Sequence, residues 1–418
     1  MDPQSIQNRT PGQLVASADA TGRAGDGQHS VLERATTARA LPGAVLVTTR
    51  TIKAASLFCY AFLLIIPFTS FDFYLYFRFH EVRSDATPYQ AFAVATLLHV
   101  LAAYCMGSNR KNFSAGVEAR LRTLRVFRVA LWFAGIAGAA VTAFCALLLP
   151  RLGGYSWVGY VGMALLVGKL CTIPCILVPH ELIHSVHRSE RVLGGVLLCF
   201  VMFPSFKIEH VRGHHVDVAT PRDPSSAERG ESIYRFLVRA MTQNYVKAWR
   251  LENERLRNFS KRWPQHEMIW WSALQASVAA FLAWAGGWQS VVFLALVSFT
   301  AVVHLEAVNY VQHYGLRRDA LGGGGFERVT TLHSWNTPAW RDQFWMVNVG
   351  RHADHHRAPG RPYQVLRYDP RSPELPIPLS LAIYLAFLPP LWRALVDPLV
   401  DSHGANGCGS PAPRGAQG

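Results

Sequence analysis

The sequence predicts an all-α membrane protein with about six transmembrane helices and a histidine-rich region on the cytoplasmic side. Three observations predict this. Half of the 418 residues are hydrophobic and only 16% are charged, against about 25% charged in typical soluble domains. Several apolar runs reach the roughly 20 residues that an α-helix needs to cross a bilayer. Short clusters of histidine follow the ends of these runs.

Six stretches are apolar and long enough to span a membrane. They are 52–71, 89–107, 129–150, 157–178, 268–287 and 289–309. Only Gly286, Gly287 and Trp288 separate the last two, which predicts a tight hairpin. We expect one membrane-embedded domain, 46–398. Residues 1–45 and 399–418, rich in small and polar residues, are expected to be disordered tails.

The basic residues predict how the helices are oriented. The loop between the second and third stretches is rich in arginine, whereas the next loop carries only Arg151. Cytoplasmic loops carry the excess of Lys and Arg. We therefore expect a protein of the cell inner membrane. Both termini, and the far ends of the fourth and sixth stretches, should lie on its cytoplasmic side. The net charge of +14 then indicates contact with membrane lipids, and we expect no nucleic-acid partner.

Two further apolar runs are not expected to cross. The run 193–206 is too short, and a crossing would put His210, His214 and His215 on the opposite side from His180. We therefore expect it to be interfacial or re-entrant. The run 376–396 is interrupted by Pro389 and Pro390, which favours an interfacial helix over a seventh span.

Four clusters hold nine candidate metal ligands. These are His180, His184, His210, His214, His215, His313, His352, His355 and His356. Residues four apart share a helix face, so the pairs 180/184, 210/214 and 352/356 are each expected to point one way. Nine ligands exceed a single zinc site and fit two metals with four or five nitrogens each. Imidazole suits Fe, Zn, Cu and Ni alike.

Several polar residues accompany the histidines and are candidates for the reaction. Glu181, Glu209 and Asp354 each neighbour a histidine and are interpreted as acceptors that orient imidazole N–H groups. The alternative is solvation at the membrane surface. Asn309 lies one helical turn before His313. Four charged residues after the second cluster are interpreted as a salt-bridged loop: Arg212, Asp217, Arg222 and Asp223.

The words around these histidines resemble those of the membrane-bound di-iron alkane hydroxylases (alkane monooxygenases). Within 155–370 they are HELIHSVHR, EHVRGHHVDVATPRDPSSAERGES, NYVQHYGL, LHSWN and RHADHHRAPGRPYQVLR. The resemblance implies that the nine histidines hold two non-haem irons. It implies O2 as co-substrate and hydroxylation of an unactivated C–H bond in a hydrophobic substrate from the bilayer. It also implies electrons from NAD(P)H, delivered by a reductase and a rubredoxin or ferredoxin.

One residue departs from that resemblance. Where alkane hydroxylases usually have Glu, this chain has Gln312, as in the xylene-type alkyl-aromatic monooxygenases. An amide cannot supply the charge of a carboxylate, so Gln312 is a candidate for setting the substrate. An alkyl-aromatic monooxygenase and a membrane fatty-acyl desaturase remain alternatives. A histidine-rich metal transporter is the non-enzymatic alternative, although transporters place ligands near the bilayer midplane.

A basic segment, 222–262, is a candidate surface for the electron carrier. It holds ten basic and five acidic residues. Such an excess can steer an acidic carrier. The alternative is anchoring to anionic lipid.

Overall fold

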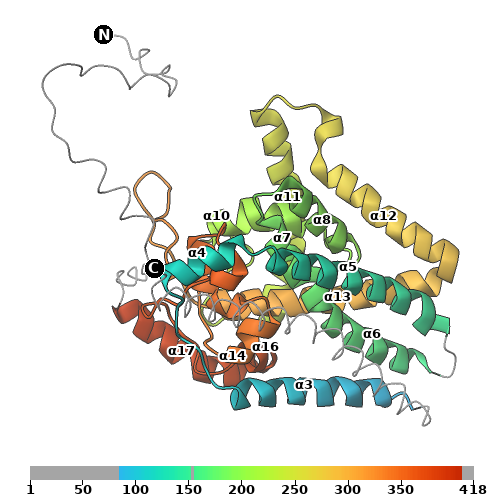
Figure 1. The fold of residues 1–418 in the computed structure, drawn as a ribbon, viewed down its shortest axis with the longest axis horizontal. Helices are drawn as coiled ribbons and strands as arrows, with labels where there is room; N and C mark the ends of the chain where they lie inside the picture. Colours follow the sequence, from blue (N-terminus) through green and yellow to red (C-terminus); the bar gives the residue numbers. More distant parts are fainter. Residues whose placement is uncertain (1–83, 152–154, 407–418) are drawn as a thin grey trace, which may run out of the picture. The chain divides into compact units, whose positions relative to one another are not determined.

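Long apolar helices dominate the computed structural model, which describes residues 84–151 and 155–406 (Figure 1). Five helical stretches are long and apolar enough to cross a membrane. They are α3 (Thr87–Cys105), α5 (Val126–Leu148) with η2 (Leu149–Arg151), α6 (Trp157–Thr172) with η3 (Ile173–Leu177) and α7 (Val178–Ile183), α12 (Glu267–Gly286), and α13 (Trp288–His313). They confirm an all-α, multi-pass protein and match five predicted spans. The sixth prediction, 52–71, lies outside the described residues.

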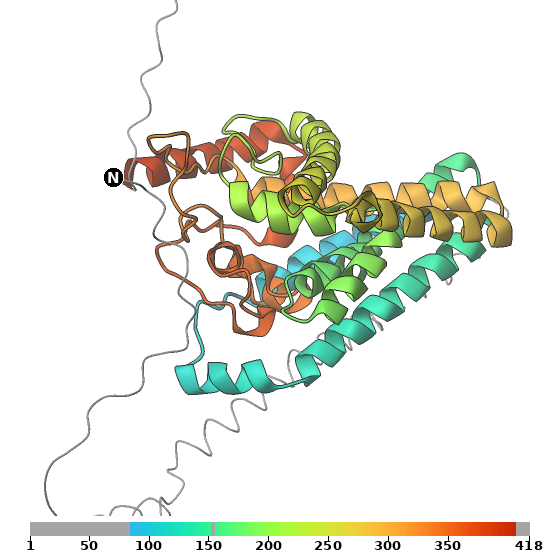
Figure 2. The same ribbon diagram turned by 90° about the horizontal axis from the view of Figure 1, so that it is seen from above.

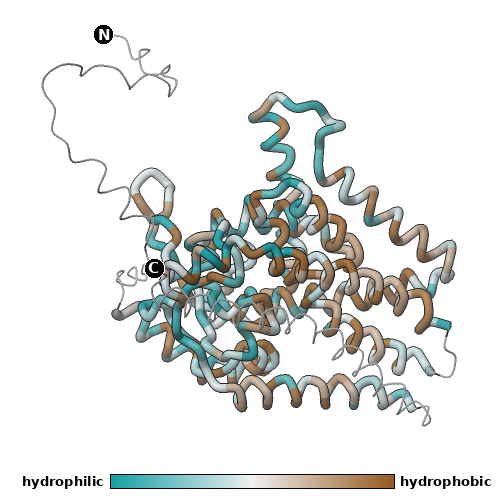
Figure 3. Tube along the Cα trace, in the orientation of Figure 1, coloured by the Kyte–Doolittle hydropathy of each residue, from teal (hydrophilic) through white to brown (hydrophobic). Residues whose placement is uncertain are grey.

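The helices differ in how deeply they lie in the protein. In the most apolar part of α6–α7, 83% of residues are buried, against 11% in α12. Helix α6 packs along α13, and α6 and α7 lie between α5 and α13 (Figure 2). Hydrophobic residues follow the long helices, and hydrophilic residues gather in the loops and short helices at their ends (Figure 3). The centre of the bundle is therefore α6–α7 with α13.

The predicted hairpin between the last two spans is present. Helix α12 ends at Gly286 and α13 begins at Trp288. Gly287 adopts a φ of +79°, a conformation that glycine reaches without steric cost.

The segment that follows α7 does not cross the membrane, as predicted for the run 193–206. Helix α8 (Arg188–Cys199) has 12 residues and is about 18 Å long, too short for a hydrocarbon core of about 30 Å. It packs against α7. The chain then passes through α9 (Phe206–Glu209), the π-helix η4 (His210–His214) and α10 (His215–Asp217).

Shorter elements complete the described chain. They are α4 (Ala115–Thr123), α11 (Ile233–Asn258), η5 (Trp263–Gln265), α14 (Trp340–Trp345), η6 (Val349–Arg351), α15 (His352–Arg357), η7 (Tyr363–Val365), α16 (Leu379–Ala386) and α17 (Pro389–Asn406). The run 376–396 divides between α16 and α17, and neither is among the helices apolar enough to cross. This agrees with the prediction of no seventh span.

The predicted start of the C-terminal tail, residue 399, is too early. Helix α17 continues to Asn406. Val400 is buried, and its side chain lies against Gly315. Asp401 pairs with Arg229 at 2.8 Å. These contacts are made with residues far away in the sequence, so the small and polar composition after Val400 did not reveal them.

Candidate metal centre

All nine predicted histidines converge, in two groups. The first histidine group is His180, His184, His210, His215 and His355, and the second is His214, His313, His352 and His356. Within each group the candidate ligand atoms lie within 4.8 Å of one another. The side chains come from the end of α7, from η4 and α10, from the end of α13, and from α15. Elements that are far apart in the sequence therefore build one centre.

The local helix type decides which histidines share a group. His180 and His184 share the first group and His352 and His356 the second, as four-residue spacing predicts. His210 and His214 lie side by side, as predicted, with their ring centres 5.2 Å apart, but they belong to different groups. They lie in a π-helix, whose hydrogen bonds run from i to i+5. His210 is instead paired with His215, with 3.0 Å between their Nε2 atoms.

The distances between ring nitrogens suit a bound metal ion. The Nε2···Nε2 distances are 3.1 Å for 180/355, 3.0 Å for 210/215, 3.1 Å for 215/355, 3.1 Å for 313/352 and 3.0 Å for 352/356. Two nitrogens that bind one metal at about 2.1 Å, at right angles, lie about 3.0 Å apart. The histidine pairs thus have the spacing of neighbouring ligands.

The protonation of the rings points the same way. Burial lowers the pKa of six histidines well below its usual value, so these rings are neutral: His184, His210, His215, His352, His355 and His356. The Nε2 atoms of His184 and His214 are buried without a hydrogen-bond partner among the described residues. Facing lone pairs repel unless a cation lies between them. The donor set therefore suits one cation in each group.

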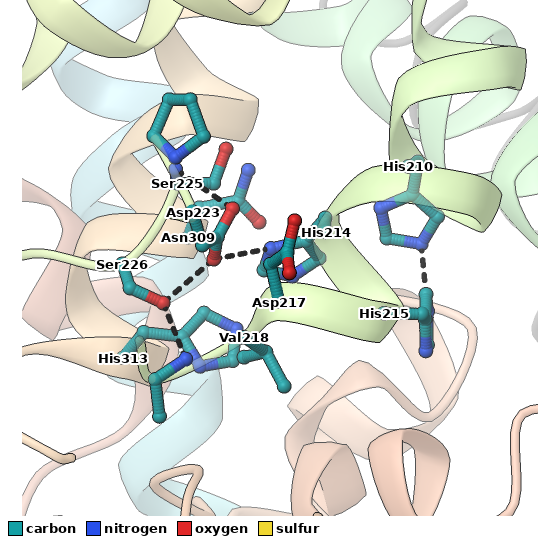
Figure 4. A network of polar contacts seen from close by, with 12 residues as sticks. His210, His214, His215, Asp217, Val218, Asp223, Ser225, Ser226, Asn309 and His313 are labelled. Carbon is teal, nitrogen blue, oxygen red and sulfur yellow. Dashed lines mark hydrogen bonds and ion pairs between the residues drawn. The ribbon is translucent and has the colours of Figure 1, made fainter. Parts of the chain in front are cut away.

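A buried carboxylate supports the second group (Figure 4). Asp223 Oδ2 lies 2.9 Å from Nδ1 of His214 and accepts a 2.6 Å hydrogen bond from Ser226. Burial alone would lower the pKa of His214, but Asp223 raises it above its usual value. A carboxylate on the outer nitrogen fixes the tautomer and orientation of a metal-binding imidazole. Asp223 was predicted to pair within a charged loop, and nothing in its spacing pointed to His214.

The network continues outward from Asp223 into two helices. Ser225 donates its N–H to Asp223 at 3.1 Å and accepts a 2.8 Å hydrogen bond from Asn244 of α11. Asn244 also donates to Glu306 at 3.2 Å, and Asn309 donates to the same carboxylate at 3.1 Å. Asn309, a predicted site residue, is thus linked to the second group through this chain of hydrogen bonds.

The part of the chain that carries the histidines is similar in sequence to known proteins. Residues 155–369 match the fatty acid desaturase family. Alkane 1-monooxygenase 2 of Alcanivorax borkumensis is 39% identical over 303 residues, which cover 72% of this chain and 79% of the relative. Alkane 1-monooxygenase 1 of Pseudomonas aeruginosa is 44% identical over 60% of this chain and 66% of the relative. The chain belongs to the alkane 1-monooxygenase family. It is an oxidoreductase, and its histidine groups are consistent with non-haem iron.

A more distant relative acts on aromatic compounds by its name, and Gln312 has a structural role in this chain. The xylene/toluene monooxygenase hydroxylase component XylM of Pseudomonas putida is 29% identical over 56% of this chain and 63% of the relative. In this chain Gln312 is buried, and its Nε2 donates to the carbonyl of Val349 at 2.8 Å. A carbonyl only accepts hydrogen bonds, so the NH2 group must face it. Gln312 therefore fastens the end of α13 to the segment that leads into α15.

Three predicted carboxylates do not orient histidines in this alkane monooxygenase relative. Glu181 accepts the N–H of Tyr363 at 3.1 Å, and Asp354 that of Arg367 at 2.8 Å. Glu209 lies 3.7 Å from Lys247 Nζ, and burial raises its pKa to about 8. None of the hydrogen bonds of the described chain joins these acids to an imidazole. Two of them hold the loop after α15 through its backbone.

Proposed function

We propose that the protein is an integral-membrane, non-haem di-iron monooxygenase. It would hydroxylate an unactivated C–H bond of a hydrophobic substrate, an alkane or alkyl chain. The reaction balances as R–H + O2 + 2 e⁻ + 2 H⁺ → R–OH + H2O. The observation that carries the proposal is the set of nine imidazoles, in groups of five and four, that come from the ends of α7 and α13 and from η4, α10 and α15. The relatives named alkane 1-monooxygenase support it.

Each histidine group would hold one iron, and together the irons would supply the reductive activation of O2. The chain's own residues hold the ligands and orient them. Asp223 keeps Nδ1 of His214 as the donor, so that Nε2 points into the second group. Gln312 positions α15, which gives ligands to both groups. The buried surfaces of α6–α7 and α13 would exclude water, which protects a reactive site from side reactions.

The electrons would come from NAD(P)H through a reductase and a rubredoxin or ferredoxin. We place the histidine groups on the cytoplasmic side of a cell inner membrane, with cytoplasmic termini, because the basic loop before α5 favours that orientation. A reporter fused after residue 287 should then be periplasmic, and one inserted within 216–260 should be cytoplasmic. A periplasmic signal at 216–260 would contradict this orientation.

A membrane fatty-acyl desaturase is the second candidate, because residues 155–369 match the fatty acid desaturase family. Gln312 and the similarity to XylM keep alkyl-aromatic compounds among the substrates to test. A metal transporter is disfavoured by membership in an oxidoreductase family.

The test combines metal analysis with product identification. Purified protein in lipid nanodiscs would receive ferrous iron, a carrier and reductase, and ¹⁸O2, with alkanes, alkyl-aromatics, fatty acids and terpenes as substrates. Two irons per chain and an alcohol with one ¹⁸O atom are expected. An alkene would identify a desaturase. Metal that exchanges freely without O2 uptake would refute the enzyme.

A further inference from the structure

A wide, open groove lies at the carboxyl end of α11 and the connection that leads to α12. Its free volume is about 900 Å³, within the roughly 300–1,000 Å³ of small-molecule sites. Arg250 and Arg257 of α11 line it together with Lys261 of the connection, and Trp249 and Trp263 add aromatic surface. None of the lining residues belongs to a histidine group. We call this space the α11 groove.

The α11 groove carries positive charge that no acid of its lining balances. None of the described residues that line it is acidic, and three are basic: Arg250, Arg257 and Lys261. No ion pair or side-chain hydrogen bond within the described chain includes these three side chains. Elsewhere on the same helix, Arg239 is paired with Glu231 at 2.7 Å and Lys247 with Asp217 at 2.9 Å. The cations of the groove are therefore available to an anionic ligand.

Helical periodicity brings the lining residues of α11 onto one face. Arg250, Asn253 and Arg257 recur at intervals of three and four residues, which places them side by side on a helix. Glu254, the next acid along the helix, is not among the lining residues. Guanidinium groups bind phosphate oxygens through paired hydrogen bonds, and lysine binds them as a point charge. A phosphate group is the anion that this set of donors suits.

The connection to α12 places the α11 groove at the membrane surface (Figure 1). Only 11% of the most apolar part of α12 is buried within the protein, so most of this membrane helix faces lipid. The ring of His266, directly before α12, has its centre 4.9 Å from those of Trp249 and Trp263, which fastens the end of α11 to the start of α12. Within 215–267, all of which the structure describes, no helix is a candidate span. The groove therefore lies on the same side of the membrane as His215.

The apolar side chains around the α11 groove favour a lipid as its occupant. Phe259, Trp263 and Trp270 are each more than 60% exposed, and Trp270 Nε1 donates to the carbonyl of Pro264 at 2.7 Å. Exposed tryptophans next to basic residues are typical of the layer where lipid headgroups lie. Basic pockets beside membrane helices bind anionic headgroups. A soluble acidic protein would match the cations but would leave the lipid-facing surface of α12 unused.

We propose that the α11 groove binds one anionic phospholipid. Arg250, Arg257 and Lys261 hold its phosphate, and its acyl chains run along the exposed surface of α12. This inference concerns a lipid site and goes beyond the proposed reaction. It is measured without turnover, so it stands or falls independently of the hydroxylase activity.

The bound lipid should also stabilise the segment that carries two of the metal ligands. Glu252 of α11 is buried and accepts a 2.5 Å hydrogen bond from Arg212 of η4, the element that holds His210 and His214. A lipid that fastens the end of α11 to α12 therefore reinforces the contact with η4. Because a ligand of the folded state alone raises the melting temperature, the lipid should do so here.

The lipid can be counted on the whole protein. The full chain in a neutral detergent would be mixed with equal amounts of dioleoyl-phosphatidylglycerol and dioleoyl-phosphatidylcholine, and retained lipid would be counted by native mass spectrometry. Phosphatidylglycerol should be favoured by at least about tenfold, since each basic residue near an anionic lipid contributes about 1 kcal/mol. Millimolar inorganic phosphate should not displace it. Equal retention of the two lipids, or displacement by phosphate alone, would overturn the proposal.

Two variants locate the lipid in the α11 groove. Arg250→Gln and Lys261→Gln should each weaken phosphatidylglycerol about fivefold, the equivalent of about 1 kcal/mol, and leave phosphatidylcholine unchanged. Both side chains are exposed, so the melting temperature without lipid should not change. Arg235→Gln, at an exposed basic residue of the same helix outside the groove, is the matched control. Equal losses in Arg235→Gln and Arg250→Gln would show diffuse attraction by net charge and refute the site.

A triple variant separates the lipid from an electron carrier. Arg250→Gln, Arg257→Gln and Lys261→Gln together should abolish both the retained phosphatidylglycerol and the rise in melting temperature that it causes. The apparent KM for the carrier should change little. Unchanged lipid retention with a raised KM would instead make the α11 groove a docking surface for the carrier and refute the lipid site.

Discussion

The two histidine groups are built from the same residue type but held in different ways. In the first group, His184 and His215 are partly exposed, whereas all four members of the second group are buried. The first group borders an opening lined by Arg128, His184 and Arg361, among others. The second group is supported from outside by Asp223 on His214 and by Ser334, 3.4 Å from Nδ1 of His313.

The first group is therefore the one that solvent can reach, and the second is the one whose imidazoles are held by hydrogen bonds from outside. The first group has a path to solvent and no carboxylate bonded to its imidazoles within the described chain. The second group is closed to solvent and carries a hydrogen-bonded network that reaches Glu306 on α13 and Asn244 on α11. Four predictions test this asymmetry, from the largest expected effect to the smallest.

Removing one ligand from each group should give the largest effect. His184→Ala and His356→Ala should each lower bound iron from about two to about one per chain. Each should lower activity by more than the 10–100-fold that is typical for loss of an outer partner. Metal analysis with Mössbauer spectroscopy should detect a different remaining iron in each variant. His187→Ala, exposed and just beyond α7, is the control. Full activity in either ligand variant would refute the shared centre.

Removing a supporting charge should affect only the second group. Asp223→Asn keeps the size of the side chain but removes the charge that faces His214. Iron in the second group should bind about 10–100-fold more weakly, and iron in the first group should be unchanged. The measurement is competition with a chelator at equilibrium.

Glu181→Gln is the control for Asp223→Asn. Its amide oxygen can still accept the N–H of Tyr363, so we expect iron affinity to change by less than about twofold. Equal loss of iron from both groups in Asp223→Asn would show that the two groups are not independently supported.

The sequence predicted the membrane helices and the nine converging histidines, because hydropathy and four-residue spacing report directly on helices. It did not predict which histidine joins which group. The π-helix at 210–214 depends on how this segment packs. Asp223 was missed for a related reason: its contact with His214 is made by the turn between them, whose path no periodic pattern describes. Glu181 and Asp354 have the expected neighbours in sequence but bond to backbone groups of a later loop.

Gln312→Glu should weaken both groups alike, in contrast to Asp223→Asn. The new carboxylate would face the carbonyl of Val349 and lose the 2.8 Å hydrogen bond. A buried polar group without its partner costs about 1–3 kcal/mol. Because α15 supplies ligands to both groups, iron should be lost from both, with a lower melting temperature.

Gln312→Met, similar in shape, serves as the comparison, because it removes the hydrogen bond without adding a carboxylate. A changed preference between alkyl-aromatic and linear substrates, with iron and melting temperature unaltered, would instead make Gln312 a determinant of substrate.

The smallest effect concerns where the electron carrier docks. Sequence alone made the basic segment 222–262 a candidate, but in the structure the end of α11 extends away from α10, the helix that begins at His215 (Figure 1). Exposed aromatic residues lie there beside the exposed basic ones: Phe259, Trp263 and Trp270. Arg255 is held by the buried Glu252. Aromatic and basic side chains together at the start of a membrane helix are typical of the lipid interface.

We therefore expect reversal of Arg257, Lys261 and Arg262 to Glu to change the apparent KM for the carrier by less than about twofold in detergent, because the Debye length at 0.1 M salt is about 10 Å. In vesicles the same variant should bind anionic lipid more weakly, by about 1 kcal/mol per reversed residue. Arg125 and Arg188 are exposed and are sequence neighbours of residues that line the opening of the first group. Their reversal should raise that KM several-fold and flatten its salt dependence. A larger rise in the apparent KM for the carrier in the α11 variant than in the Arg125/Arg188 variant would place the carrier on α11. The exposure of the first group would then not serve electron entry.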